Sequence, residues 1–248
     1  MRYFIELAYN GKQYHGWQVQ PNAVTVQEVL DKALSLLLGE PISILGAGRT
    51  DAGVHASQMF AHFDISNSIE DDNIVYRLNS YLPPDIAIKD IFRVKDDTHA
   101  RFDATSRTYF YKVSTSKDVF QDDQSYTVLQ PLDVEAMNKA ATYLLDYKDF
   151  KCFSKAHTDV KTYNCDIRFA QWKTEGEQLI FTITADRFLR NMVRAIVGTL
   201  INIGLGKLDV LVMHSIIESK DRSEAGFSVP AKGLFLSEIT YPETIKLE

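Results

Sequence analysis

The sequence of 248 residues predicts an α+β fold. Three observations support this class. Short segments with alternating apolar residues are typical of strands, and apolar residues at helical spacing appear between them. The two halves of the chain also share a coarse order, in which strands are followed by a helix that precedes a strand pair. No repeat at the level of single residues accompanies this similarity.

In the first half, strands are expected at residues 2–9, 59–65 and 86–94. A helix is expected between the first two, because Thr25 and Glu28 have the spacing of a capping box and Gly39 is suited to end a helix. The apolar residues at helical spacing in this segment are Val29, Leu30, Ala33, Leu34, Leu37 and Leu38.

In the second half, a strand is expected at 107–115 and a helix at 132–146. A strand pair at 162–172 and 178–185 turns around Glu175 and Gly176. Next come a long helix that begins near Asp186, a shorter helix at about 208–219 and a last strand at 233–241. The polar, irregular segment 117–130 is a candidate connection between two lobes.

The composition indicates a globular protein of the cytoplasm. Of the residues, 45% are hydrophobic, and the longest apolar run, residues 195–205, is too short to span a membrane. The first residues do not form the apolar stretch of a signal peptide. The two cysteines give no disulfide framework. A net charge of −6 argues against a protein that coats nucleic acid indiscriminately, but it permits a local basic groove.

The segment 46–56, GAGRTDAGVHA, lies between two expected strands and allows several interpretations. It is a poor dinucleotide-binding motif, because Asp51 stands where a third glycine would face the pyrophosphate, and it lacks the lysine of a Walker loop. A metal site of Asp51, His55 and His62 is weakened by Gly53, which would break the helix that aligns the first two. We expect no metal, since zinc-module spacing is also missing among Cys152, His157 and Cys165.

Two interpretations of this loop remain. An isolated aspartate such as Asp51 is often a turn residue that accepts hydrogen bonds from backbone N–H groups. Alternatively, the small residues around Arg49 and Asp51 let the backbone approach a bulky ligand, and Arg49 can bind a phosphate through two hydrogen bonds. Because nothing nearby supplies the histidine base of a serine or cysteine triad, Asp51 would itself act as nucleophile or base.

Residues 186–200, DRFLRNMVRAIVGTL, predict an amphipathic helix. Its apolar face comprises Leu189, Met192, Val193, Ile196, Leu200 and Ile203, and its polar face comprises Arg187, Arg190, Asn191, Arg194 and Gly198. Three arginines in the first two turns would oppose the helix dipole and repel each other. An anion facing this end would offset both costs, whether a phosphate or a carboxylate of the chain. We expect a functional basic face; the alternative is an ordinary solvated helix.

The segment 104–112, ATSRTYFYK, places Arg107, Tyr109 and Tyr111 on one face of a strand. Interleaved basic and aromatic residues suit contact with phosphates and stacking on a base. The alternative is a core strand whose tyrosines simply pack.

Together these three stretches resemble the tRNA pseudouridine synthase A (TruA) family. GAGRTDAGVHA matches the signature loop of the family, SRTYFY its tyrosine strand and FLRNMVRAIVG its arginine helix. The resemblance runs from about residue 3 to 241, with further matches in YHGWQVQ, TVQEVLDKAL, NSYLPPDIAI, HARFDAT and AKGLFL. Asp146 stands where the family often has glycine, and Val229 where it often has alanine; neither lies in these motifs.

The resemblance implies a pseudouridine synthase fold, with two similar α+β lobes and a mixed, largely antiparallel sheet, meeting at a catalytic cleft. Residues 1–104 would form the lobe with the aspartate loop, and residues 105–248 the lobe with the tyrosine strand and the arginine helix. It also implies a cytoplasmic homodimer without cofactor or metal. This enzyme would isomerise uridine to pseudouridine at positions 38, 39 and 40 of the tRNA anticodon stem-loop.

Under this resemblance Asp51 is the catalytic aspartate, Arg194 its arginine partner and Tyr109 the tyrosine that stacks on the base. Leu234 lines the uracil pocket. The residues expected to bind RNA are Arg49, His55, Arg107, Arg187 and Arg190. Asp51 either attacks C1′ or removes a ribose proton to give a glycal-like intermediate. The rival function is a catalytically silent RNA-binding module; a hydrolase that uses Asp51 with His55 is a more distant one.

Overall fold

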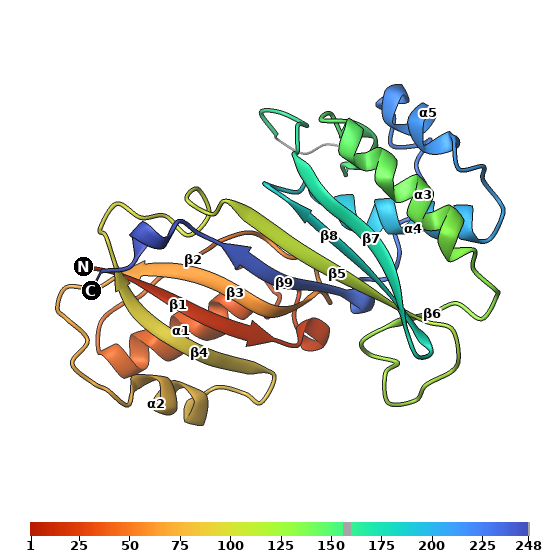
Figure 1. The fold of residues 1–248 in the computed structure, drawn as a ribbon. Helices are drawn as coiled ribbons and strands as arrows, with labels where there is room; N and C mark the ends of the chain where they lie inside the picture. Colours follow the sequence, from red (N-terminus) through yellow and green to blue (C-terminus); the bar gives the residue numbers. More distant parts are fainter. Residues whose placement is uncertain (156–159, 248) are drawn as a thin grey trace. The chain divides into compact units, whose positions relative to one another are not determined.

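The computed structural model describes residues 1–155 and 160–247, which form two compact units. Unit 1 comprises Met1–Thr105 and Leu236–Glu248, and unit 2 comprises Ser106–Phe235. Each contains β-strands and helices (Figure 1), so the α+β class is confirmed. The division into lobes 1–104 and 105–248 stays a prediction about domains. In the described part of the chain, no helix is long and apolar enough to cross a membrane.

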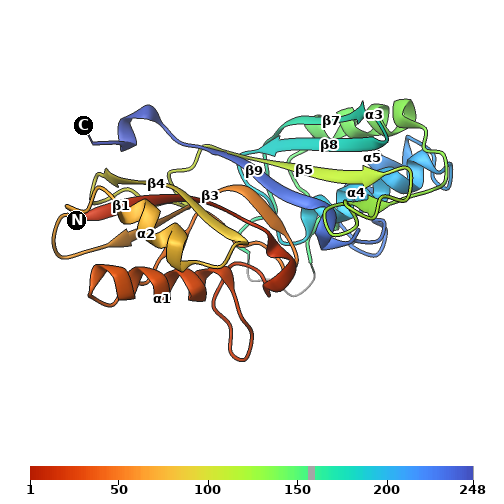
Figure 2. The same ribbon diagram turned by 90° about the horizontal axis from the view of Figure 1, so that it is seen from below.

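The sheet of unit 1 has the strand order β4-β1-β3-β9. These strands are β1 (Arg2–Tyr9), β3 (His55–Asp64), β4 (Ile86–Val94) and β9 (Leu234–Thr240), whose residues from Leu236 onward belong to unit 1. The short β2 (Leu45–Gly46) pairs with β3, and β1 runs antiparallel to both β3 and β4. The helices α1 (Val26–Leu38) and α2 (Ile74–Tyr81) lie on one face of this sheet (Figure 2). The C-terminal strand β9 thus returns to the sheet that the N-terminal strand begins.

The ends of α1 confirm the capping signals in the sequence. The hydroxyl oxygen of Thr25 accepts a hydrogen bond from the backbone N–H of Glu28 at 3.3 Å, and Gly39 ends the helix with φ 74°. Leu30 and Leu34 of this helix are fully buried, as are Ile5 and Leu7 of β1. This apolar layer supports the strands that flank the aspartate loop.

The sheet of unit 2 has the order β5-β8-β7, with antiparallel pairs. Its strands are β5 (Ser106–Ser114), β7 (Ile167–Glu175), β8 (Gln178–Ala185) and the short β6 (Tyr126–Thr127), which pairs parallel with β5. The expectation that residues 117–130 connect two lobes is wrong, because this segment stays inside unit 2. The helices of the unit are α3 (Val134–Thr142), α4 (Met192–Gly204) and α5 (Val212–Ser219).

Two helices differ from the sequence-based expectation. Helix α2 was not predicted, since its eight residues carry only two buried apolar side chains, Ile74 and Leu78. Helix α4 begins at Met192, six residues after the expected start at Asp186. It is also buried on nearly all sides, so it is a core helix of unit 2 rather than a surface helix with a solvated face.

Candidate functional site in the aspartate loop and the arginine and tyrosine segments

Neighbouring side chains in the loop between β2 and β3 differ in their exposure to solvent. Arg49 is exposed and Asp51 is half-buried, whereas Thr50 between them is buried. The buried hydroxyl of Thr50 lies 2.9 Å from the phenolic oxygen of Tyr9, at the end of β1. The loop is therefore anchored at its middle residue, so that its neighbours Arg49 and Asp51 project from a fixed backbone.

The segment after β1 holds this loop through its backbone. The N–H of Trp17 donates to the carbonyl oxygen of Thr50 at 3.3 Å, and the N–H of Gly53 donates to the carbonyl oxygen of Tyr14 at 3.2 Å. The phenol of Tyr14 in turn donates to a carboxylate oxygen of Asp85 at 2.6 Å. Because these contacts lie on both sides of Asp51, they fix the backbone position of this carboxylate.

Several glycines permit this close packing. A Cβ atom at Gly16, where φ is +88°, would lie 2.4 Å from the carbonyl oxygen of Thr50. A Cβ atom at Gly46 would lie 2.5 Å from the indole nitrogen of Trp17. Gly48 differs, because a Cβ atom there would meet nothing within 4 Å. Gly16 and Gly46 thus serve the packing of the protein, while the open space beside Gly48 leaves the backbone accessible to a ligand.

His55 contributes to the same packing. Its side chain is buried, and its Nδ1 accepts a hydrogen bond from the backbone N–H of Gly11 at 3.0 Å. A Cβ atom at Gly11 would lie 2.0 Å from the carbonyl oxygen of Val54, so the two backbones are in direct contact. The structure therefore gives His55 a contact inside unit 1, and its expected contact with RNA stays a prediction.

The arginines do not all belong to one helix. The residue before α4, Asn191, has φ 67°, and the helical backbone does not extend past it toward Asp186. The carboxylate of Asp186 instead accepts the backbone N–H groups of Asp166 and Arg187, at 2.6 and 2.7 Å, which stabilises a turn. The expectation of three arginines in the first two helical turns is therefore wrong: Arg187 and Arg190 precede the helix.

Arg194 is the third residue of α4 and is held by the chain segment that precedes β9. Its Nε donates to the carbonyl oxygen of Val229 at 2.7 Å. The backbone N–H of Val229 donates to the carbonyl oxygen of Arg194 at 3.2 Å. One hydrogen bond thus orients the guanidinium group, and the other ties the backbone of Arg194 to the same residue. Arg190, by contrast, is exposed, and Arg187 is half-buried.

The two tyrosines of the tyrosine strand, Tyr109 and Tyr111, differ in burial and in their contacts. Tyr111 is fully buried, its hydroxyl donates to the carbonyl oxygen of Pro230 at 2.8 Å, and burial raises the pKa of this phenol far above its usual range. Tyr109 is half-buried and meets the ring of Phe188 edge to face, with centroids 5.2 Å apart. Arg107 donates from Nη1 to the carbonyl oxygen of Asp186 at 2.8 Å. The core interpretation thus fits Tyr111, and Tyr109 keeps an accessible ring.

Leu234 is the first residue of β9 and is 6% exposed. It follows Gly233, where a Cβ atom would lie 2.7 Å from the ring of Tyr111. The predicted site residues therefore fall into two sets. Unit 1 contains Arg49, Asp51 and His55; unit 2 contains Arg107, Tyr109, Arg187, Arg190, Arg194 and Leu234.

The candidate metal ligands weighed above do not form a cluster. In the described part of the chain, no group of three histidine, cysteine or carboxylate side chains could hold a metal ion. His157 lies outside the described residues. Burial raises the pKa of both Cys152 and Cys165 to about 12, which keeps these thiols protonated at neutral pH. The Nδ1 atom of His62 accepts the backbone N–H of Ala100 at 3.2 Å.

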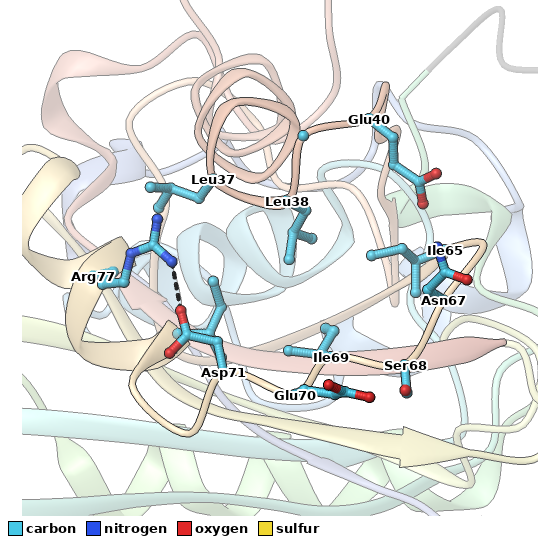
Figure 3. A pocket seen from close by; sticks show the side chains of 12 residues that line it. Leu37, Leu38, Glu40, Ile65, Asn67, Ser68, Ile69, Glu70, Asp71 and Arg77 are labelled. Atoms are coloured by element: carbon cyan, nitrogen blue, oxygen red, sulfur yellow. Dashed lines mark hydrogen bonds and ion pairs between the residues drawn. The ribbon is translucent and has the colours of Figure 1, made fainter.

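A cavity of about 300 Å³ lies elsewhere in unit 1, between the end of α1, residues 65–71 and the start of α2 (Figure 3). Its lining mixes apolar side chains, such as Leu37 and Ile69, with polar ones, some of which are paired. Asp71 forms an ion pair with Arg77, and Glu40 accepts the backbone N–H of Ser66 at 2.8 Å. The cavity contains none of the predicted site residues, and we assign it no chemistry.

The residues alone predict no role for the segment that supports the aspartate loop. The signal was present in YHGWQVQ, residues 14–20, where a glycine stands between aromatic and polar residues. Without knowledge of the partner loop, this pattern is read as a turn. Its function as a support for residues 46–55 depends on contacts between segments far apart in sequence.

Known proteins match this chain over almost its whole length. The sequence pattern of the tRNA pseudouridine synthase family matches residues 7–103 and 140–242, which include the aspartate loop and the arginine segment. The tRNA pseudouridine synthase A of Parabacteroides distasonis is 55% identical over 247 residues, covering 98% of this chain and 97% of that protein. The protein of the same name from Bacteroides thetaiotaomicron is 55% identical over 247 residues, covering 98% and 92%. That from Porphyromonas gingivalis is 51% identical over 250 residues, covering 99% of each. The chain belongs to the tRNA pseudouridine synthase family.

Proposed function

We propose that the protein isomerises uridine to pseudouridine at positions 38, 39 and 40 of the tRNA anticodon stem-loop. The observation that carries this proposal is 55% identity over 98% of the chain to a protein named tRNA pseudouridine synthase A. The anchoring of the aspartate loop supports it, because a reaction at one sugar carbon needs a carboxylate in a fixed position.

The target uridine must leave its base stack before its glycosidic bond is accessible, which costs a few kcal/mol. The bond between C1′ and N1 then breaks, the uracil turns, and a bond forms between C1′ and C5. C5 loses its proton and N1 gains one, so the product is an isomer of the substrate. Asp51 promotes the first step, either as a nucleophile at C1′ or as a base that removes a ribose proton.

The other residues position the substrate. Arg194 acts with the Asp51 carboxylate, Tyr109 stacks on the displaced uracil, and Leu234 contributes an apolar surface. Arg49 enters the space that the base leaves or contacts the RNA backbone. The remaining contacts to RNA phosphates come from Arg107, Arg187 and Arg190, while the buried His55 supports the aspartate loop from within unit 1. No step needs a redox centre or a nucleotide cofactor.

The protein acts as a cytoplasmic homodimer in this proposal. An acidic chain of 248 residues offers a limited basic surface for a tRNA, and two subunits together enlarge it. Light scattering of the active protein tests this part. A mass of one chain under conditions of full activity contradicts it.

Release of tritium from tRNA labelled at C5 of uridine tests the reaction, because isomerisation expels this hydrogen and binding alone does not. The wild-type protein should release it, and Asp51→Asn should not, although its tRNA affinity stays within a few-fold. Asp72→Asn is the matched control, since Asp72 is an exposed carboxylate in another loop of unit 1. Tight tRNA binding without release by the wild-type protein would instead establish the catalytically silent RNA-binding module.

A further inference from the structure

The turn between β4 and β5 presents an exposed aromatic side chain. Phe102 is 73% exposed. The guanidinium carbon of Arg101 lies 5.6 Å from the centroid of this ring, and the ring of His99 lies 4.2 Å from it with a tilt of 39°. Three side chains with planar groups are therefore in contact at the surface, within four consecutive residues of the motif HARFDAT.

The backbone of this turn is rigidly held from several parts of unit 1. Nη1 of Arg2 donates to the carbonyl oxygen of Thr98 at 3.0 Å. The buried Ala100 donates its N–H to Nδ1 of His62 at 3.2 Å, and its carbonyl oxygen accepts from the hydroxyl of Tyr241 at 2.6 Å. The backbone that carries Phe102 is therefore fixed by contacts within unit 1.

Hydrogen bonds inside the turn hold its backbone and the imidazole of His99 as well. The backbone N–H of His99 donates to Oδ2 of Asp103 at 2.6 Å, and the N–H of Arg101 donates to Nδ1 of His99 at 3.0 Å. The imidazole plane is thus oriented by the same backbone that carries Phe102. A preformed aromatic surface loses little conformational freedom when a flat ligand stacks on it.

We propose that His99, Arg101 and Phe102 form a binding site for an unpaired nucleobase of the tRNA substrate. This inference rests on the proposed function. Aromatic rings and guanidinium planes are the groups on which proteins stack unpaired RNA bases. The site would hold the RNA at a place other than the reacting uridine.

The surrounding charges favour a base over a run of phosphates. Asp64 is paired with Arg2 at 2.7 Å, Asp96 accepts the backbone N–H of Arg2 at 3.1 Å, and Asp103 belongs to the turn itself. This many carboxylates would repel several phosphates, but they do not oppose the stacking of a neutral ring. Arg101 is the cation of the turn that can reach a single flanking phosphate.

The covalent chain keeps this turn within reach of the same RNA. Phe102 lies seven positions before Tyr109, the residue proposed to stack on the target uracil. An extended chain of this length spans at most about 25 Å. A tRNA whose uridine is bound at Tyr109 therefore has other nucleotides close enough to reach Phe102.

The affinity of a tRNA for three variants tests the site. Phe102→Ala should weaken binding about tenfold, as for the loss of one stacked base. Arg101→Lys should weaken it less, because it keeps the charge and loses the plane. The matched control is Phe120→Ala, since Phe120 is 90% exposed and lies in a loop of unit 2 beside Asp118, Asp122 and Asp123. The control should bind within twofold of the wild-type protein.

Phe102→Trp adds a direct signal. Both native tryptophans, Trp17 and Trp172, are buried, so an indole at residue 102 is an exposed reporter. Stacking on a base should quench its fluorescence when tRNA is added and should protect it from acrylamide. This readout needs only a folded protein and separates stacking from any loss of stability in the alanine variant.

The inference is overturned if Phe102→Ala binds tRNA within twofold of the wild-type protein, or if the indole at residue 102 is not quenched. A change in mass by light scattering without quenching would assign Phe102 to a subunit interface instead. Binding is measured apart from isomerisation. A wild-type protein that binds tRNA but releases no tritium therefore defeats the proposed catalysis, while weaker binding by Phe102→Ala still supports the base site.

Discussion

The backbone of Gly16 lies against the carbonyl oxygen of Thr50, so closely that a Cβ atom at residue 16 would stand 2.4 Å from that oxygen. This contact joins the segment after β1 to the residue that precedes Asp51. The N–H of the next residue, Trp17, donates a hydrogen bond to the same oxygen at 3.3 Å. The position of the Asp51 carboxylate therefore depends on a glycine 35 residues earlier in the sequence.

Gly16→Ala should reduce both stability and the single-turnover rate of isomerisation. The left-handed backbone at φ +88° costs an alanine roughly 1–2 kcal/mol, and the clash with Thr50 adds to this. Gly39→Ala is the matched control, because Gly39 has φ +74° but open space around its Cβ position. Urea unfolding and tritium release measure both variants. Equal losses of stability in the two, with a normal rate for Gly16→Ala, would show that the contact does not position the loop.

His55→Ala should destabilise the protein by about 2–3 kcal/mol, because it leaves a cavity and a buried Gly11 N–H without an acceptor. His55→Asn should lose less, since its amide oxygen can accept that N–H. Urea unfolding of the two variants measures this difference. If His55 instead binds RNA, both variants will keep their stability and lose tRNA affinity.

The sequence predicts a helix or strand well when residues at its own ends determine where it starts and stops. The limits of β1 and β4 agree with the expected ranges 2–9 and 86–94, and α1 starts after Thr25 and ends before Gly39 as its capping residues require. Such ends are set by side-chain caps and alternating burial, which act within a few residues.

The sequence could not predict features that depend on distant contacts. The spacing of apolar residues predicts a helix from Asp186 onward. The carboxylate of Asp186 instead accepts the backbone N–H of Asp166, 20 residues away, and a turn forms there, so α4 starts later. The return of β9 to the strands of unit 1 requires knowledge of the whole sheet. The same limit applies to the site, where the role of Gly16 depends on where Thr50 lies.

Gly48→Ala should leave stability unchanged and weaken tRNA binding about tenfold. A Cβ atom there meets nothing within 4 Å in the protein, so any cost must come from the ligand that approaches the backbone between Ala47 and Arg49. Thermal unfolding and a binding titration measure the two quantities. Unchanged binding would show that RNA does not approach this glycine closely.

Stability should fall as the pH is lowered from about 6.5 to about 4, and His62 should contribute to that loss. Burial, with Arg2 and His99 nearby, lowers the pKa of His62 from 6.5 to about 4, against the opposing effect of Asp64 and Asp103. The unfolded chain therefore binds a proton in this range before the folded protein does, and the proton favours unfolding. His62→Gln should flatten the pH dependence of urea unfolding between pH 6.5 and 4. An unchanged slope would assign the acid sensitivity to other groups.

Arg194→Ala should lower the single-turnover rate by roughly 100-fold, the size of effect that follows removal of one well-placed charged hydrogen-bond donor. The structure holds this side chain by the hydrogen bond from Nε to Val229, so its guanidinium is fixed in direction. Arg194→Lys keeps a charge but loses Nε, and should recover only part of the rate. Arg190→Ala is the control: Arg190 is exposed and precedes α4, so its loss should weaken tRNA binding and make that binding less salt-dependent, with little effect on the single-turnover rate. If Arg194→Ala keeps its single-turnover rate and loses only affinity, Arg194 is a phosphate contact and does not act with Asp51.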